Sequence, residues 1–258
     1  MTPEQDFWAL GDYGVVAPRL EQVAEDLVDT AHLVHGSRVL DVAAGTGNVA
    51  VIAAERGARV LACDLSPAMV DAGQKRTRAA HLPVEWKIAD AQSLPLPDHA
   101  MDAALSAFGV MFAPDPERAA AELFRVVRSG GTVAVANWTP TGFTAANSEL
   151  LSDVLPPPPA DFHPLDWGEP DTARERLGRG GKLELFEREV AWEFETVDDA
   201  STWFENGAPW AAARARLGDE DYVALQGRLR AVVEQFAEPT DSGVALRPPY
   251  LLARVRVR

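Results

Sequence analysis

An acidic residue beside a glycine turn is the feature of this sequence best suited to hold a ligand. The stretch RVLDVAAGTGNVA, residues 38–50, contains Asp41 and the pattern G-x-G-x-x-A that begins at Gly45 and Gly47. Small residues let a backbone turn approach a ligand closely. Asp64 follows 19 residues after Gly45, where a carboxylate can accept hydrogen bonds from both hydroxyls of a ribose. The spacing therefore indicates a nucleoside-containing ligand.

Asp41 distinguishes between two such ligands. A dinucleotide would bring its pyrophosphate close to this carboxylate, and each pair of like charges at about 5 Å costs about 3 kcal/mol at an effective dielectric near 20. S-adenosylmethionine has no phosphate, and its sulfonium and ammonium groups suit a carboxylate. In addition, none of the tyrosines Tyr13, Tyr222 and Tyr250 has a lysine four residues later. That removes the proton-transfer pair common in short-chain dehydrogenases.

These residues need a scaffold that brings the ends of several strands together. Between residues 37 and 138, β-branched runs alternate five times with helical segments, which predicts a parallel sheet with helices on both faces. In such a sheet, ligands bind outside the carboxyl ends of the strands. Ser66 and Pro67 read as the N-cap and first residue of one helix. The segment 115–131 reads as another helix, closed by Gly130 and Gly131.

The alternation stops after Trp138. A proline-rich stretch near residues 155–170 reads as a loop, residues 182–196 as one long strand, residues 198–237 as helical and residues 244–257 as a final strand. We expect the two late strands to form an edge hairpin interrupted by a helical lid. The expected division is an N-terminal helical cap over 1–36, a ligand-binding core over 37–140, and a lid with closing antiparallel strands over 141–258, all in one compact domain.

Four segments together resemble class I S-adenosylmethionine-dependent methyltransferases: VLDVAAGTGNVA, ACDLSPAMV, ADAQSLPLPDHAMDAAL and AAAELFRVVRSGGTVAVANW. They are similar to the branch with the ubiquinone and menaquinone C-methyltransferases and many small-molecule methyltransferases, of methyltransferase type 11. The resemblance covers about residues 35–140. It implies a Rossmann-like α/β sheet and S-adenosylmethionine as cofactor, with S-adenosylhomocysteine as product. It implies cofactor contacts from Asp41, Ala43, Gly45, Thr46, Gly47, Asp64, Leu65, Asp90, Ala91 and Ser106.

Within that implied site, each part of the cofactor has its own residues. Asp41 and the glycine turn would hold the methionine part, Asp64 the ribose, and Asp90 with Ala91 the adenine edge. One departure from the family pattern is Ala43, which stands where the first glycine of the usual turn would be. We expect its methyl group to fit if the residue keeps a negative φ.

The methyl acceptor has weaker candidates. Phe108 follows the fourth strand, and Trp8, Tyr13 and Trp210 fall in the expected cap and lid, where they either form an aromatic roof over a flat acceptor or only close the core. His163, in the proline-rich loop, is a candidate general base against the alternative of a surface histidine. No ligand set for a metal is evident.

Charge and composition limit the partners. The net charge of −15 repels phosphate backbones and anionic lipids, so we expect neither nucleic acid nor membrane as partner. A single cysteine and the lack of a basic-then-apolar start favour a cytoplasmic protein. The expected activity is methyl transfer to an O, N or C nucleophile of a small molecule, a specialised metabolite or quinone-like aromatic. A nicotinamide-dependent oxidoreductase and a non-methylating cofactor-binding protein stay open as alternatives, as does a homodimer.

Overall fold

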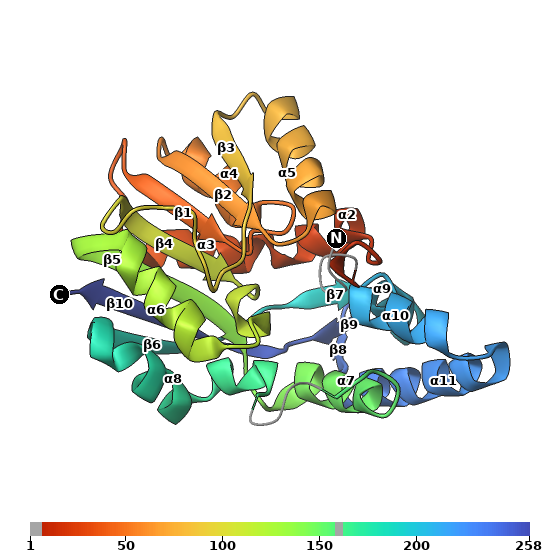
Figure 1. Ribbon diagram of the computed structural model, residues 1–258. Helices are drawn as coiled ribbons and strands as arrows, with labels where there is room; N and C mark the ends of the chain where they lie inside the picture. Colours follow the sequence, from red (N-terminus) through yellow and green to blue (C-terminus); the bar gives the residue numbers. More distant parts are fainter. Residues whose placement is uncertain (1–6, 158–161) are drawn as a thin grey trace.

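The computed structural model describes residues 7–157 and 162–258. Its centre is a seven-stranded sheet with the order β3-β2-β1-β4-β5-β10-β6 (Figure 1). The first five strands in sequence are parallel, and β10 joins antiparallel between β5 and β6. The strands are β1 (Arg38–Val42), β2 (Arg59–Asp64), β3 (Val84–Ile88), β4 (Met101–Ala107), β5 (Val127–Trp138), β6 (Gly181–Glu189) and β10 (Pro249–Val257).

Helices cover both faces of this sheet, which confirms the predicted α/β class. On one face lie α3 (Glu21–Thr30), α4 (Asn48–Glu55) and α5 (Pro67–Ala79). On the other lie α6 (Pro116–Val126) and α8 (Pro170–Leu177), which also contact each other. The central strands are buried on both faces: β1 exposes only its first residue, and residues 131–137 of β5 are all buried. Burial from both sides explains why these strands read as continuous apolar runs.

A second layer built mainly from the C-terminal part stands beside the carboxyl ends of the parallel strands (Figure 1). It contains a small sheet of order β7-β9-β8, which the sequence did not predict, and four helices. Its elements are α7 (Gly142–Ser152), β7 (Trp192–Phe194), α9 (Val197–Phe204), α10 (Ala208–Arg216), α11 (Asp219–Phe236), β8 (Glu238–Thr240) and β9 (Gly243–Leu246). We call these elements the lid layer. The expected edge hairpin is present, because β6 and β10 pair and the lid helices separate them in sequence.

Short segments complete the chain. The N-terminal segment, residues 7–20, contains α2 (Tyr13–Val16) and the 3-10 turn η1 (Ala17–Leu20), and α2 contacts α9 of the lid layer. Pro18 lies in η1, which separates α2 from α3 within the expected helical cap. Three more 3-10 turns are η2 (Val110–Phe112), η3 (Pro164–Gly168) and η4 (Gly178–Gly180).

Three sequence expectations are corrected. Gly130 and Gly131 do not close a helix: α6 ends at Val126, and β5 begins at once and pairs with β4 across a bulge. The single strands expected over 182–196 and 244–257 are each divided, since one part joins the large sheet and the other the small one. Ser66 precedes α5 as expected, yet its hydroxyl makes no capping bond.

Candidate functional site

The glycine turn joins β1 to α4 through left-handed backbone. Gly45 has a φ of +55° and Gly47 a φ of +88°, and helix α4 begins immediately afterwards. A β-carbon on Gly47 would lie 2.8 Å from the ring of Trp86, so both conformation and packing require glycine there. A β-carbon on Gly45 would meet nothing within 4 Å. The backbone beside Gly45 is therefore open to a ligand, and the neighbouring Thr46 is half-buried.

Ala43 departs from the sequence expectation. Its φ is +52°, not negative. An alanine is strained in this region, because its β-carbon crowds the following backbone. The strain is tolerated here because Ala43 packs against Gly109, which has no side chain to compete for the space.

Asp41 lies at the end of β1 with 1% of its surface exposed. Its Oδ2 accepts a hydrogen bond of 2.9 Å from the backbone nitrogen of Ala50 in α4. Burial raises the pKa of Asp41 to about 8, and the charge of Asp64 adds to that rise, while the bond from Ala50 opposes it. The carboxyl is therefore poised to ionise when a cation approaches.

Asp64, at the end of β2, faces the same turn. Its carboxylate accepts hydrogen bonds from the backbone nitrogens of Gly45 at 2.8 Å and Ser66 at 2.9 Å. Burial raises the pKa of Asp64 although these bonds work in the other direction. No lysine or arginine among residues 7–157 and 162–258 forms a salt bridge with Asp41 or Asp64. Two buried carboxyls without a protein cation suit a ligand with a cationic end.

Asp90 follows β3, so the three acids stand at the carboxyl ends of neighbouring strands in the order β3-β2-β1. The carboxylate of Asp90 is bound by Gln92, through its backbone nitrogen at 2.8 Å and its side-chain amide at 3.0 and 3.1 Å. Gln92 is itself held by the residue that caps α6, because the Asp115 backbone nitrogen donates to its side-chain oxygen at 2.9 Å. Leu65 and Ala91, beside Asp64 and Asp90, are half-buried.

Ser106 does not face a ligand. It is fully buried, and its hydroxyl donates to the carbonyl of Val42 at 2.7 Å and accepts from the Val110 nitrogen at 3.0 Å. These bonds join the ends of β1 and β4, so Ser106 positions the site from behind instead of lining it. Phe108, two residues on, has a φ of +58° and stacks on Trp138 with 3.7 Å between ring centroids and 8° between planes.

Comparisons with known proteins agree with this geometry. Residues 40–135 match the family model of a methyltransferase domain. The uncharacterized protein Rv1405c of Mycobacterium tuberculosis is 36% identical over 97% of this chain and 93% of its own length. The demethylmenaquinone methyltransferase of Thermus thermophilus is 41% identical over 40% of this chain and 48% of its own length.

Among solved structures, a phosphoethanolamine N-methyltransferase of Haemonchus contortus, in complex with S-adenosylhomocysteine, covers 92% of this chain and 53% of its own. The TM-score is 0.61 at 15% identity, so this similarity concerns the fold. The chain belongs to the class I S-adenosylmethionine-dependent methyltransferases. Its cofactor is S-adenosylmethionine, and the nicotinamide alternative is thereby set aside.

The residues present fit this cofactor. The methyltransferase offers open space beside Gly45 and two carboxyls without a protein cation at the turn. The hydroxyl of Ser66, next to Asp64, is buried and has no hydrogen-bond partner among the described residues. In residues 7–157 and 162–258 no three His, Cys, Asp or Glu side chains gather as metal ligands. Over the same residues, no helix combines the length and apolar character needed to cross a bilayer.

The N-terminal segment ties the cofactor turn to the lid layer. Asn48, the first residue of α4, donates its side-chain amide to the carbonyl of Ala17 at 2.8 Å. The indole of Trp203 in α9 donates to Val15 at 3.2 Å, and that of Trp192 in β7 donates to Arg19 at 3.0 Å.

Trp8 and Tyr13 belong to this segment. The ring of Trp8 packs edge-on against that of Phe112 in η2, with 4.6 Å between the ring centroids, and its centroid lies 6.4 Å from that of Tyr13. Burial raises the pKa of Tyr13, and the charge of Asp64 contributes to that rise.

Two acceptor candidates lie elsewhere. Trp210 is 2% exposed and donates its indole hydrogen to Asn147 of α7 at 3.0 Å, so it closes the core of the lid layer and forms no roof over an acceptor. His163 is exposed, and its Nδ1 accepts a bond of 3.2 Å from the nitrogen of Leu165, which caps η3. This bond favours a capping role for His163 over that of a general base.

Sequence reasoning missed Asn48, Gln92 and Trp138. A polar residue directly after the glycine turn was the only sequence signal for Asn48. Gln92 follows Asp90 by two residues, the spacing of a local side-chain turn. Trp138 is the last residue of the fifth strand, and an aromatic residue at a strand end beside the expected site was the sequence signal for it.

Proposed function

We propose that this methyltransferase moves the sulfonium methyl of S-adenosylmethionine to an O, N or C nucleophile of a small neutral or cationic molecule, a specialised metabolite or quinone-like aromatic. The observation that carries the proposal is the row of Asp41, Asp64 and Asp90 at the ends of three adjacent strands, around a left-handed glycine turn. A row of acids with an open backbone between them suits a ligand that carries a cation, a ribose and a base.

Each part of the row has a role in holding the cofactor. Asp41 and the turn from Gly45 to Gly47 would hold the methionine end, where a carboxylate attracts the ammonium and sulfonium groups. Asp64 still has lone pairs after it accepts two backbone bonds, and these would accept the ribose hydroxyls. Asp90 with Ala91 would read the adenine edge, and Leu65 would pack on the base.

Aromatic residues support an aromatic acceptor. Phe108 and Trp138 stack at the carboxyl ends of β4 and β5, beside the cofactor turn. Phe112, four residues after Phe108, contacts Trp8. The relative from Thermus thermophilus carries the name of a demethylmenaquinone methyltransferase. The net charge of −15 disfavours a polyanionic acceptor.

The chemistry asks mainly for alignment. The bound cofactor supplies a methyl on sulfonium, which is already a strong electrophile. The chain would orient the acceptor in line with that methyl, and alignment of two reactants is worth about 7–11 kcal/mol. In this proposal the core over residues 37–140 binds the cofactor. The cap over 1–36 and the lid segment over 141–258 bind the acceptor and exclude water.

The test has a binding part and a product part. Calorimetry should show S-adenosylmethionine and S-adenosylhomocysteine binding at micromolar concentrations or below. Purified enzyme with methyl-labelled cofactor should then label quinols, phenols or amines from a panel of small aromatics. Binding without labelling of any panel member, together with turnover that leaves the methyl on the cofactor, would instead indicate the non-methylating alternative.

A further inference from the structure

Strand β3 lies at one end of the large sheet (Figure 1). It pairs with β2 from Val84 to Ile88, and among residues 7–157 and 162–258 no strand pairs with its outer edge. Alternate side chains of a strand face opposite sides of the sheet, so Glu85 and Lys87 share one face while Val84, Trp86 and Ile88 share the other. An open edge of this kind is a template for pairing with a further strand.

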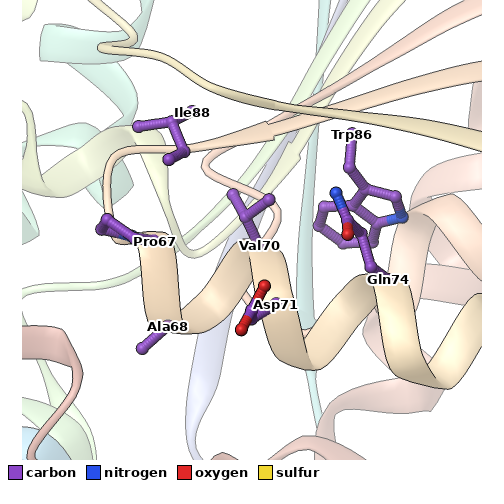
Figure 2. A pocket seen from close by; sticks show the side chains of 7 residues that line it. All are labelled: Pro67, Ala68, Val70, Asp71, Gln74, Trp86 and Ile88. Atoms are coloured by element: carbon purple, nitrogen blue, oxygen red, sulfur yellow. The ribbon is translucent and has the colours of Figure 1, made fainter.

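The apolar face of this edge is hollowed. A pocket of about 450 Å³ lies between β3 and α5, and its lining combines the apolar Trp86, Val70 and Ile88 with the polar Asp71 and Gln74 (Figure 2). Ile88 is 54% exposed. Figure 2 shows Ile88 above Pro67, and Trp86 next to Gln74 at the other end of the hollow. An occupant that covers the strand edge would also cover Ile88 and the mouth of this pocket.

The sequence of β3 is complementary to itself. It reads Val-Glu-Trp-Lys-Ile, and a two-fold axis at Trp86 would pair two copies antiparallel. Glu85 of each copy then lies opposite Lys87 of the second copy, and Val84 lies opposite Ile88. Residues directly opposite in an antiparallel pair share one face, so the two ion pairs would lie on one side of the sheet and the apolar pairs on the other. We propose that β3 is a homodimer interface, in which two copies pair edge to edge.

Helix α5 supports the same axis. Gly73, near the middle of α5, lies directly against the ring of Trp86, so an axis at Trp86 passes close to that point. Asp71 precedes it, and the exposed Lys75 and Arg78 follow it. Two antiparallel copies of α5 would therefore bring Asp71 of one copy toward the basic end of the other. Such a contact is isologous, the symmetry of most homodimers.

Charged residues on an edge strand also serve to block pairing, and lysine is the usual choice. In β3, however, the charges are of opposite sign and equally spaced about Trp86, and they already form an intrachain contact of 3.4 Å on exposed side chains. The arrangement repels most foreign strands and favours a second copy.

The experiment measures the mass of the full chain in solution, by light scattering or sedimentation over the micromolar range. The unmodified protein should have twice the 27.9 kDa chain mass. Lys87→Glu places four acids about the axis and should weaken the dimer about tenfold or more. Glu85→Lys should do the same with four bases. The double variant Glu85→Lys, Lys87→Glu restores opposite charges and should restore the dimer.

The matched control is Lys182→Glu, the same charge change on β6, the other edge of the sheet. It should leave the mass unchanged, and all variants should still bind S-adenosylhomocysteine, so that loss of the dimer is separated from loss of the fold or of the cofactor site. The proposal would be overturned if the unmodified protein is monomeric over the whole concentration range. It would also be overturned if the charge-swapped double variant is monomeric while Lys87→Glu is dimeric.

Discussion

Ala43 packs so closely against Gly109 that a β-carbon on residue 109 would lie 2.6 Å from the β-carbon of Ala43. The two residues stand at the carboxyl ends of β1 and β4, and both Ala43 and the neighbouring Phe108 have positive φ. Left-handed conformations of non-glycine residues cost about 1–3 kcal/mol each and persist where the surroundings hold them. The cofactor turn and the loop that carries Phe108 are therefore locked together.

Gly109→Ala should destabilise the protein by about 1–3 kcal/mol, since the new methyl group has no space and the backbone of Ala43 must move. Ala43→Gly should be close to neutral, because relief of the positive φ offsets the greater freedom of glycine in the unfolded chain. Thermal or denaturant unfolding measures both. Gly227→Ala is the control, as a β-carbon at this exposed position of α11 meets nothing within 4 Å. Equal losses at positions 109 and 227 would show that the contact with Ala43 has no special weight.

The parallel core was predictable from sequence because its signals are local. Apolar runs, helix starts such as Ser66–Pro67 and the turn at Gly45 each lie within a few residues. The same reasoning failed at Gly130 and Gly131, where pairing with β4 overrides the helix-ending preference of glycine. The small sheet β7-β9-β8 was missed since its three-residue and four-residue strands gain their order only from contacts distant in sequence.

The site was predictable in its residues and less so in their bonds. The sequence places Asp41, Asp64 and Asp90 at strand ends, yet it gives no sign that the Asp64 carboxylate already binds the nitrogens of Gly45 and Ser66. Ser106 faces inward because its hydroxyl finds the carbonyl of Val42, a partner 64 residues away. Long-range bonds of this kind have no signature in spacing.

Gln92 should control how Asp90 reads the adenine. Gln92→Glu replaces a donor amide with a second acid beside the Asp90 carboxylate, where the amide now lies at 3.0 and 3.1 Å. The Asp90 carboxylate then loses the two donor bonds that orient it and faces a like charge, so the affinity for S-adenosylhomocysteine should fall about tenfold. A positioning role is tested by comparing the affinity for S-adenosylhomocysteine with that for S-inosylhomocysteine, in which hypoxanthine replaces adenine.

The preference should shrink in Gln92→Glu because the amide no longer orients the Asp90 carboxylate toward the adenine amino group. Gln235→Glu is the matched control, with the same change at an exposed position of α11. A uniform loss of affinity for both compounds would indicate that Gln92 only supports the loop.

Asp64→Ala should weaken S-adenosylmethionine by about 10- to 100-fold, because hydrogen bonds to a charged group contribute about 1.5–3 kcal/mol each. It should also lower the unfolding temperature, since the nitrogens of Gly45 and Ser66 lose their acceptor. Calorimetry and thermal unfolding measure the two effects. Asp153→Ala removes an acid from a 68% exposed surface pair and should change neither. If the two variants lose affinity equally, net charge and not the ribose contact explains the effect.

Asp41 should make the free protein less stable as the pH rises. Burial raises its folded-state pKa from 3.8 to about 8, so the folded protein keeps a proton that the unfolded chain has lost. The resulting stability is complete below about pH 4 and is lost as the pH rises through about 8, by at most about 1.4 kcal/mol per pH unit. Asp41→Asn keeps the bond from Ala50 without the titration, so unfolding measured from pH 5 to 8 should show a flatter profile and a higher stability at pH 8.

The affinity for the cofactor should change in the opposite direction. Ionised Asp41 attracts a cationic ligand, so S-adenosylmethionine should bind more tightly as the pH rises toward 8, with release of a proton that calorimetry in buffers of different ionisation enthalpy detects. In Asp41→Asn both the pH dependence and the proton release should disappear. Asp102→Asn is a control of opposite sign: hydrogen bonds from Arg38 lower the pKa of Asp102, so its contribution to stability is lost only at acid pH. If Asp41→Asn leaves the stability profile between pH 5 and 8 unchanged, the carboxyl is already ionised in the folded protein, and its attraction for the cofactor needs no proton release.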